Sequence, residues 1–572
     1  MPARFCRLLF FLLISLSARG QSRPAADLII TNARVWTGDD AHPTAQAVAV
    51  LGERIIAVGS SKEIGVLRDQ HTKVIDAGGR LLLPGFNDAH VHFVEGGEGL
   101  DAVDLNDATS TAEFARRIAA KAKTTRKGDW IRGGNWDETK WPGSPLPTKE
   151  LIDSFTSDNP VFIDRYDGHA ALANSVALQL AGINAQTQNP PGGLLVRDAQ
   201  GNPTGVLKDA AKFLVLKLIP PITHDQRVAA IKRALEYAAS VGVTSFQEMN
   251  DEDTDSFADI AAYKELLEKG ELTARVYVAA SIADWKKEAD VGVRHAFGSP
   301  WLRIGGLKGF ADGSLGSRTA YFFEPYSDEP GNFGLLAHQM HPLSQMQGWI
   351  TNADAAGLQL CIHAIGDRAI ATVLDMFAEA AKQNGESDRR FRIEHAQHVA
   401  AKDFDRFSKL NVIASVQPYH QIDDGRWAEG RIGHDRASRT YPFRTLLNHG
   451  VHLAFGTDWS VAPLNPLFGV YAAVTRATLD GKNPNGWFPE QKLTVAEAVR
   501  AYTMGSAYAE FQENGKGSIA AGKLADMVLL SDDIFTIDPV KIRDVKVTTT
   551  IVGGKVVWNS PLQRHSDAKT HN

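Results

Sequence analysis

The sequence predicts an α/β protein: a (β/α)8 TIM-like barrel, a small β-sandwich formed from both chain ends, and an inserted segment after the first barrel strand. Helices that end at glycine or asparagine recur between residues 223 and 458, and each is followed at once by a short apolar strand. The later strands end in polar residues, namely His363, His395, Gln417 and Asp458. A closed barrel places its site at the C-terminal ends of many strands, whereas a doubly wound sheet binds ligand at one switch point. We therefore favour the barrel.

The first complete helix–strand unit shows the pattern best. Thr223 and Gln226 form a capping box, and the helix that they begin is expected to run to Ser240. Gly242 ends it, and an apolar strand starts at Val243. The same succession recurs later in the chain, with helices ending at Gly357, Gly385, Asn411 and Gly450.

The two ends of the chain have a different pattern, with short apolar runs broken by glycine or polar turns. Because both ends are strand-like and flank the helix–strand units, we expect residues 26–84 and 513–560 to form one small sandwich. The barrel then occupies residues 85–512.

Residues 100–221 do not follow the helix–strand rhythm, and they contain several tryptophans and loops rich in proline and glycine. We interpret them as an inserted subdomain packed over the barrel mouth. A lid over the site and a structural elaboration without substrate contact both remain open.

Composition sets limits on function. The chain has 572 residues, 22% of them charged, and a net charge of −6. There is no basic excess of the kind that nucleic-acid binding requires. We expect a small-molecule substrate and leave homo-oligomerisation open.

The N-terminus resembles a secretory leader. Arg4 and Arg7 precede the apolar run Leu8–Leu16, and small residues lead to an expected cut after Gly20. The run is short for a membrane span, so we expect export to the periplasm or the medium without stable membrane association, although an uncleaved anchor is the alternative. Removal of residues 1–20 leaves Cys361 as the only cysteine, so no internal disulfide is expected. We interpret Cys361 as a buried small residue, since no base partner is evident.

The stretch Leu81–Phe93 (LLLPGFNDAHVHF) organises the chain. An apolar strand ends in polar residues, and His90 and His92 are two positions apart. Side chains at positions i and i+2 of a strand share one face, so the two imidazoles should point the same way. Two convergent neutral imidazoles suit a borderline-soft divalent metal such as zinc.

Three further residues stand at the ends of other predicted strands. His363, His395 and Asp458 should converge with His90 and His92, and this set can hold one or two divalent ions. Lys308 is expected at another strand end, where a protonated amine beside cations is unfavourable. Either Lys308 lies away from the metal or its amine has taken up carbon dioxide to form an anionic carbamate.

At these residues the sequence resembles the amidohydrolase superfamily, in particular its YtcJ-like branch, which includes N-substituted formamide deformylases. The resemblance spans nearly all of the chain after the leader. Its motifs are PGFNDAHVH (84–92), GNWD (134–137), DGHAALAN (167–174), KGFADGSLGSRTA (308–320), HAIGDRA (363–369), EHAQ (394–397), GTDW (456–459) and GSIAAGKLAD (517–526). Asn87 stands where relatives often carry an aliphatic residue, which affects no catalytic position.

The resemblance implies a metal-dependent hydrolase with one or two divalent metals, zinc first, with manganese, iron or cobalt as alternatives. It implies that His90 and His92 hold the more buried metal and that His363 and His395 hold the more exposed one. Carbamylated Lys308 would bridge the two, and Asp458 would be both a metal ligand and the general acid/base. The expected target is a non-peptide C–N bond of amide, formamide or carbamate type. For Lys308, a plain substrate-binding lysine beside a single metal is the alternative.

Three residues are weaker candidates for substrate contact: His169 from the insertion, Arg318 as a partner for a carboxylate, and Trp136 as a pocket wall. For each, a purely structural role is equally open. Glu394 should face away from His395, because neighbours on a strand point to opposite faces.

Two other functional readings remain. The same kind of site attacks other carbonyls, so an esterase, a lactonase or a dipeptidase is an alternative. A non-catalytic binding or regulatory relative is the other, and the loss of a metal ligand would favour it; the sequence retains all six.

Overall fold

The centre of the molecule is a nearly closed barrel of eight parallel strands. The computed structural model describes residues 25–250 and 254–560. The strands pair in chain order, and the last meets the first through a bridge between Trp459 and Val91. They are β8 (Phe86–Val91), β15 (Val243–Met249), β16 (Arg275–Ser281), β18 (Leu302–Phe310), β19 (Gln359–Ala364), β20 (Arg392–His395), β21 (Ile413–Val416) and β22 (Leu453–Phe455). The predicted (β/α)8 fold class is confirmed.

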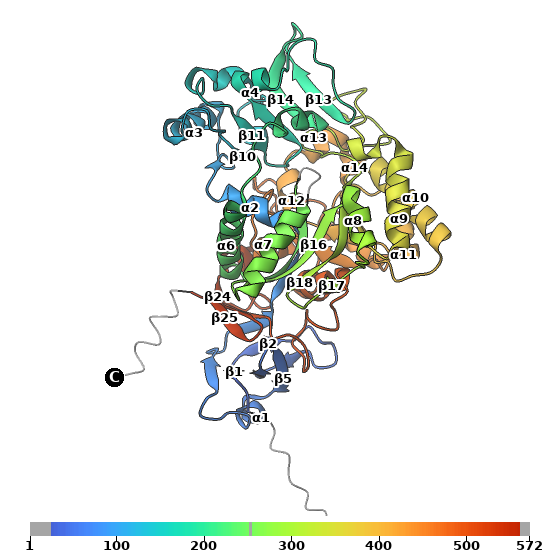
Figure 1. The fold of residues 1–572 in the computed structure, drawn as a ribbon. Helices are drawn as coiled ribbons and strands as arrows, with labels where there is room; N and C mark the ends of the chain where they lie inside the picture. Colours follow the sequence, from blue (N-terminus) through green and yellow to red (C-terminus); the bar gives the residue numbers. More distant parts are fainter. Residues whose placement is uncertain (1–24, 251–253, 561–572) are drawn as a thin grey trace, which may run out of the picture.

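Helices cover the outside of this barrel, as the alternating pattern requires (Figure 1). The capping box of Thr223 and Gln226 begins α6 (His224–Ser240). Gly242 follows with φ +82°, where a side chain would meet Val528 at 2.9 Å. Later helices include α9 (Leu343–Ala355), α10 (Asp367–Asn384), α11 (Phe404–Lys409), α15 (Phe443–Asn448) and α16 (Pro466–Thr475).

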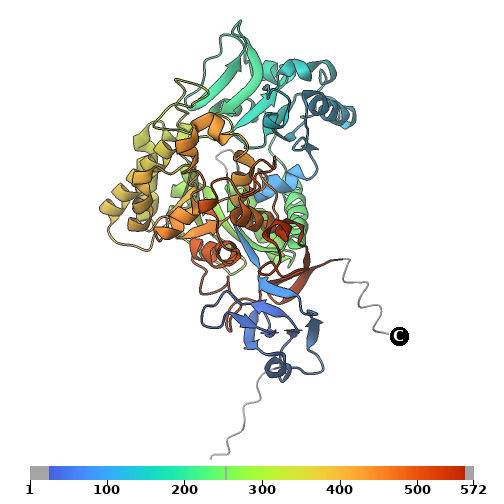
Figure 2. The same cartoon turned by 180° about the vertical axis from the view of Figure 1, so that it is seen from behind.

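The predicted sandwich is also present, at one end of the molecule (Figure 2). One sheet has four strands from the N-terminal part: β5 (Arg54–Gly59), β4 (Ala47–Leu51), β1 (Leu28–Thr31) and β6 (Lys73–Asp76). The other joins both chain ends, in the order β25 (Lys555–Asn559), β24 (Val547–Val552), β23 (Met527–Leu530), β7 (Leu81–Pro84), β2 (Arg34–Trp36) and β3 (Thr44–Ala45). The apolar packing between the sheets draws on both ends, since Ile30, Leu82 and Met527 share one buried cluster.

Gly85 connects the sandwich to the barrel. It separates β7 from β8, and a side chain there would lie 2.2 Å from Oγ1 of Thr244. The strand can therefore pass from the sandwich directly into the barrel wall, which carries His90 and His92 to the far end of β8.

The segment after the first barrel strand forms a third sheet at the opposite end of the molecule (Figure 1). Its order is β13 (Gly193–Arg197), β14 (Pro203–Asp209), β12 (Ala170–Ala173), β11 (Phe162–Arg165), β10 (Gly133–Trp136) and β9 (Val103–Asp104). Helix α3 (Thr111–Thr124) packs on it through Phe114 and Ile118. We refer to residues 100–221 as the insertion.

The boundaries that we assign to the sandwich, the barrel and the insertion stay predictions. The expected leader, residues 1–20, lies outside the described residues. Within the described part of the chain, no helix has the length and apolar character needed to cross a membrane.

Candidate metal centre and active site

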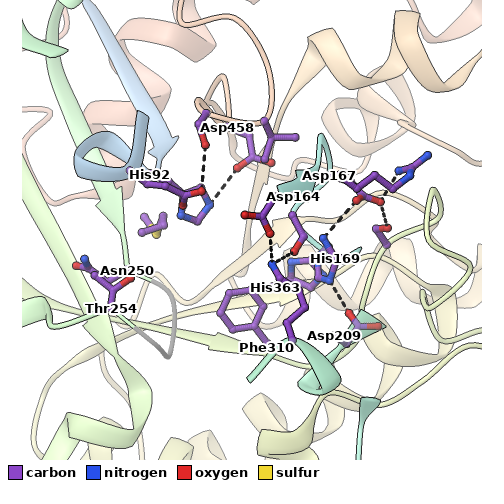
Figure 3. A pocket seen from close by; sticks show the side chains of 18 of the residues that line it. His92, Asp164, Asp167, His169, Asp209, Asn250, Thr254, Phe310, His363 and Asp458 are labelled. Atoms are coloured by element: carbon purple, nitrogen blue, oxygen red, sulfur yellow. Dashed lines mark hydrogen bonds and ion pairs between the residues drawn. The ribbon is translucent and has the colours of Figure 1, made fainter. Parts of the chain in front are cut away.

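A cavity of about 500 Å³ lies where the barrel strands end and the insertion begins. Its wall includes His92, Lys308, His363, His395 and Asp458 from the barrel. The insertion contributes another part of the wall, including His169 and Asp209 (Figure 3). These five barrel residues, all predicted for the site, thus lie together at the C-terminal end of the barrel.

His90 and His92 converge on one oxygen of Asp458. Nε2 of His90 lies 3.4 Å from Oδ1 of Asp458, and Nε2 of His92 lies 3.3 Å from the same oxygen. Asp458 reaches this place because its backbone adopts φ +60° and its N–H donates to the carbonyl of His90 at 2.8 Å. The closure of the barrel therefore also builds the site.

A buried carboxylate holds the ring of His90. Oε2 of Glu394 lies 2.7 Å from Nδ1 of His90, and neither side chain is exposed. Burial alone would raise the pKa of Glu394, but Arg392 and the bond to His90 keep that pKa well below its usual range. A carboxylate only accepts, so Nδ1 carries the proton and Nε2 presents a lone pair to the cavity.

The expectation that Glu394 faces away from His395 is wrong. Arg392 and Glu394 alternate normally along β20 and point into the barrel. His395 then adopts φ +70°, which turns its side chain back towards the same interior. Alternation fails here because His395 has left the extended conformation.

His363 and His395 lie beside this pair. The ring centroids of His363 and His395 are 4.6 Å apart, and those of His90 and His395 are 4.9 Å apart. Burial, together with nearby cationic or imidazole groups, lowers the pKa values of His363 and His395 well below the usual range. Neutral imidazole is the form that binds a metal.

Lys308 projects into the same cluster from β18. Its Nζ lies 3.2 Å from Nε2 of His90, and the residue is almost fully buried. Phe310 also lines the cavity, and its ring centroid is 4.7 Å from Nζ. Lys308 therefore lies next to Nε2 of His90, a position that fits both a carbamate and a plain lysine beside a single metal.

His420 belongs to the cluster, although the sequence alone does not assign it a role. Its Nε2 lies 3.1 Å from Oδ2 of Asp458, so the two carboxylate oxygens of Asp458 face different histidines. The residue sits in α12 (Pro418–Asp424), three positions after the polar strand end at Gln417. A histidine just beyond a barrel strand is the signal that could have identified it.

The donor atoms fit a divalent metal. His90, His92 and Asp458 form one group whose ligand atoms lie within 4.8 Å of one another, and His395, His420 and Asp458 form a second. Oδ1 of Asp458 is buried without a hydrogen-bond partner among the described residues. Such an oxygen is costly unless a ligand binds it, and the set of imidazole and carboxylate donors is one that zinc and related ions prefer.

His363 is oriented differently from the other histidines. Its Nε2 lies 3.2 Å from the carbonyl oxygen of Gly313 and 3.5 Å from Oδ1 of Asp312. Asp312 also accepts the N–H groups of Ile365 and Gly366, and burial raises its pKa to about 7. With Nε2 occupied in this way, Nδ1 of His363 is the atom left for a metal.

The comparison with known proteins decides the family. The model of the amidohydrolase family matches residues 73–558. The chain belongs to the amidohydrolase family.

Its relatives span nearly the whole chain. Protein LONG AFTER FAR-RED 3 of Arabidopsis thaliana is 38% identical over 93% of this chain and 92% of its own length. Putative amidohydrolase YtcJ of Bacillus subtilis is 32% identical over 85% and 90%, and N-substituted formamide deformylase of Arthrobacter pascens is 28% identical over 92% and 97%. The predicted resemblance to the YtcJ-like branch is confirmed.

A solved structure agrees with the fold of this amidohydrolase. An uncharacterized metal-dependent hydrolase from Pyrococcus horikoshii has a TM-score of 0.72 and 28% identity, covering 90% of this chain and 99% of its own. Together with the metal-fitting clusters, the family makes this amidohydrolase a metal-dependent hydrolase with a small-molecule substrate.

Of the three substrate-binding candidates in the amidohydrolase, His169 lies at the cavity. Its ring centroid is 5.0 Å from that of His363, and its Nδ1 is 2.7 Å from Oδ1 of Asp209. Burial alone would lower the pKa of His169, but Asp209 and Asp167 raise it above the usual value. His169 is a fixed, readily protonated donor beside the candidate metal ligands (Figure 3).

Trp136 does not line the cavity, and we withdraw it as a pocket wall. It is fully buried in the core of the insertion, against Phe114 and Trp141, and its Nε1 donates to the carbonyl of Ile163 at 3.2 Å. On β10 the neighbouring residue Asn135 faces the cavity instead. The prediction is wrong by one residue, because neighbouring side chains on a strand point to opposite faces.

Arg318 is also placed away from the cavity. It adopts φ +55°, and its guanidinium pairs with Asp328 at 2.7 Å in a partly exposed position. The cavity-lining arginines among the described residues are Arg132, Arg165 and Arg227. A substrate carboxylate at Arg318 is therefore not supported by the geometry.

Proposed function

We propose that this amidohydrolase cleaves a non-peptide C–N bond of amide, formamide or carbamate type in a small molecule. The observation that carries the proposal is the position of the two carboxylate oxygens of Asp458. Its Oδ1 faces His90 and His92, and its Oδ2 is held by His420. The name of the Arthrobacter relative, a formamide deformylase, supports a C–N bond as the target.

The proposed ligands follow the geometry. His90, His92 and Asp458 would hold one divalent ion, with zinc as the first choice and manganese, iron or cobalt as alternatives. His363 and His395 would hold a second ion, as the resemblance to the family implies, and His395 belongs to the second group of convergent donors, with His420 and Asp458. A bound divalent cation supplies Lewis acidity, which lowers the pKa of water and polarises a carbonyl.

The chain's own groups would move the proton. Asp458 accepts a proton from the attacking water as the oxygen adds to the carbonyl carbon. It then gives that proton to the leaving nitrogen as the C–N bond breaks, so that the products are an acid and an amine. His420 holds Oδ2 of Asp458 and leaves Oδ1 facing His90 and His92. His169, fixed by Asp209, can donate a hydrogen bond to the substrate.

We also propose that Lys308 is carbamylated. The neutral amine adds to carbon dioxide and loses a proton, and the product is an anionic group with two oxygens. Carbamylation replaces the positive charge of Lys308 with a negative one next to Nε2 of His90. A protonated Lys308 would repel a divalent metal ion bound there. A carbamate on Lys308 would supply anionic oxygen ligands beside His90.

Metal removal and reconstitution test the proposal. Apo-protein should be inactive, and zinc, manganese or cobalt with bicarbonate should restore hydrolysis of a panel of formamides, N-acyl compounds and carbamates. Esters, lactones and dipeptides belong in the same panel because the site could attack their carbonyls. Protein that binds metal but turns over only the esters would overturn the C–N assignment, and protein inert to the whole panel would favour the non-catalytic alternative.

The Lys308→Ala variant tests the carbamate. It should lose on the order of 1,000-fold or more in kcat/KM, a magnitude typical for loss of an essential group. Short carboxylic acids should restore part of the activity, whereas neutral amides of the same size should not. Unchanged turnover in the variant would remove Lys308 from the site.

Export is proposed on the leader alone. If residues 1–20 act as a leader, N-terminal sequencing of the mature protein should begin at Gln21. A mature protein that starts at Met1 would contradict this proposal.

A further inference from the structure

The charged groups on the cavity wall are already matched to one another. Arg165 is buried and pairs with Glu138 at 2.8 Å and with Asp167 at 2.7 Å. Lys212 pairs with Asp164 at 2.8 Å. These guanidinium and ammonium groups face the cavity with their charge already balanced by the protein.

The other side of the cavity repeats this arrangement. Arg227 pairs with Asp259, and both are buried. Arg132 lies 3.7 Å from Glu98 in a partly exposed position, and Lys217 is exposed at the mouth. Water and salt screen charges at such positions, so Arg132 and Lys217 would stabilise a buried anion only weakly.

The overall balance of the wall is acidic. Among the described residues that line the cavity, eleven are aspartate or glutamate and six are lysine or arginine. One of those six, Lys308, belongs to the metal cluster. An anionic group far from the metals would therefore meet more carboxylates than cations.

The mouth has an apolar rim. The link between α5 (Phe213–Leu216) and α6 contributes Ile219, Pro220, Pro221 and Ile222 to the cavity wall, next to Leu216. An alkyl or aryl group passing this rim loses contact with water, which favours binding by about 0.8 kcal/mol per buried CH₂. The rim thus suits an apolar substituent on the leaving nitrogen.

We infer that the substrates are N-acyl derivatives of apolar amines that carry no carboxylate on the leaving group. The inference rests on the proposed C–N hydrolysis and names its substrate class. N-acyl amino acids and dipeptides are disfavoured, because their free carboxylate would meet Arg165, Lys212 and Arg227 already paired with aspartate or glutamate, while exposed Lys217 is screened by water. Desolvating a carboxylate without a partner is costly.

A matched substrate pair tests this inference. N-hexylformamide and N-formyl-6-aminohexanoate share the scissile bond and the spacer, and they differ in a carboxylate placed too far away to bind the metals. The zinc-loaded enzyme should hydrolyse the neutral compound with a kcat/KM at least about 30-fold higher, since burying an unpaired charged group carries a penalty of at least that size. Equal or faster hydrolysis of the anionic compound would overturn the inference and leave C–N hydrolysis standing.

A variant that adds a free cation to the rim provides a matched control. Ile219 is partly buried, unlike exposed Lys217, so a guanidinium there is less screened by water. Ile219→Arg should raise kcat/KM for the anionic compound at least about 10-fold and change that for N-hexylformamide less than about threefold. Ile219→Gln, which adds polarity without charge, should not reproduce the gain. A similar gain in both variants would show that charge is not the cause and would contradict the inference.

Two further measurements separate this inference from the proposed function. If hexyl formate is hydrolysed and neither formamide is, C–N cleavage fails, and hexyl formate against 6-formyloxyhexanoate then tests the charge preference. If nothing is hydrolysed, calorimetry with the zinc-loaded protein compares binding of the two formamides. Tighter binding of the neutral compound supports the inference; equal binding, tighter binding of the anion or no binding of either overturns it.

Discussion

At the scale of single residues, the site depends on groups that orient the proposed ligands. Glu394 fixes which nitrogen of His90 carries the proton, and His420 divides the two oxygens of Asp458 between different partners. Neither role is visible in a motif, because each is a contact between elements that are separate in the chain. The structure therefore adds a layer of orienting residues to the ligands that the sequence indicates.

Replacing Glu394 with glutamine should weaken metal binding by about 10- to 100-fold, the usual effect of losing a carboxylate behind a metal-binding histidine. A glutamine amide lacks the negative charge that draws the proton to Nδ1 of His90, so Nε2 becomes a poorer ligand. Competition with a chromogenic chelator would measure the affinity. Glu394→Asp should recover part of it, and an unchanged affinity in Glu394→Gln would remove Glu394 from this role.

At the scale of elements, ion pairs fasten the insertion to the barrel. Asp137 on the insertion pairs with Arg426 of the barrel at 3.1 Å, and Asp167 accepts the hydroxyl groups of Ser314 and Ser317. Asn135 donates to the carbonyl of Ser460 at 3.1 Å. These contacts hold His169 at the metal cluster, so the insertion acts as a fixed part of the cavity wall in this structure.

The Asp137→Ala variant tests this attachment. It removes the carboxylate that pairs with Arg426 of the barrel, and loss of one side of a buried ion pair costs about 3–5 kcal/mol. Urea unfolding should show the destabilisation, and limited proteolysis should cut first within residues 100–221. Glu113→Ala, which breaks the more exposed pair with Arg116, is the control and should change stability by less than about 1 kcal/mol. Equal stability of the two variants would contradict the attachment.

A buried histidine outside the site links stability to pH. Burial first, and Arg436 second, lower the pKa of His398 to about 3, while its Nδ1 lies 2.7 Å from the hydroxyl of Thr440. In the unfolded chain this pKa is about 6.5. Between those two values the unfolded state binds a proton that the folded state does not, so stability falls as the pH falls.

The expected slope for this one group is about 1.4 kcal/mol per pH unit between about pH 6.5 and 3. Urea unfolding at a series of pH values would measure it against His398→Gln, which cannot titrate. The variant should have a shallower slope over that interval. Identical slopes would show that His398 does not become charged on unfolding in this range.

At the scale of the whole molecule, the sequence was sufficient for the architecture. Apolar strands that follow capped helices predict the barrel, and strand-like runs at both ends predict the sandwich, because these features are local. The main errors concern which face of a strand a side chain occupies. We expected Trp136 at the cavity, but its neighbour Asn135 is there and Trp136 is buried. We expected Glu394 to face away from His395, but both point into the barrel because His395 has φ +70°. Backbone turns of that kind are set by tertiary packing and leave no periodic signal.

The convergence of the proposed ligands was predictable for a different reason. His90, His92, His363, His395 and Asp458 stand at strand ends, and parallel strands of one barrel bring their ends together. His420 lies beyond its strand, on a helix, so position alone did not single it out. The substrate side of the cavity depends on which charges pair with one another, and only the three-dimensional arrangement shows that.

The central claim is that this amidohydrolase holds divalent metal between its strand-end histidines and Asp458. The most direct test is a crystal structure of zinc-reconstituted protein, with anomalous data collected on both sides of the zinc absorption edge. We predict a zinc peak within bonding distance of Nε2 of His90, Nε2 of His92 and Oδ1 of Asp458, with any second peak beside His395. Fully reconstituted crystals without an anomalous peak at these atoms would contradict the account.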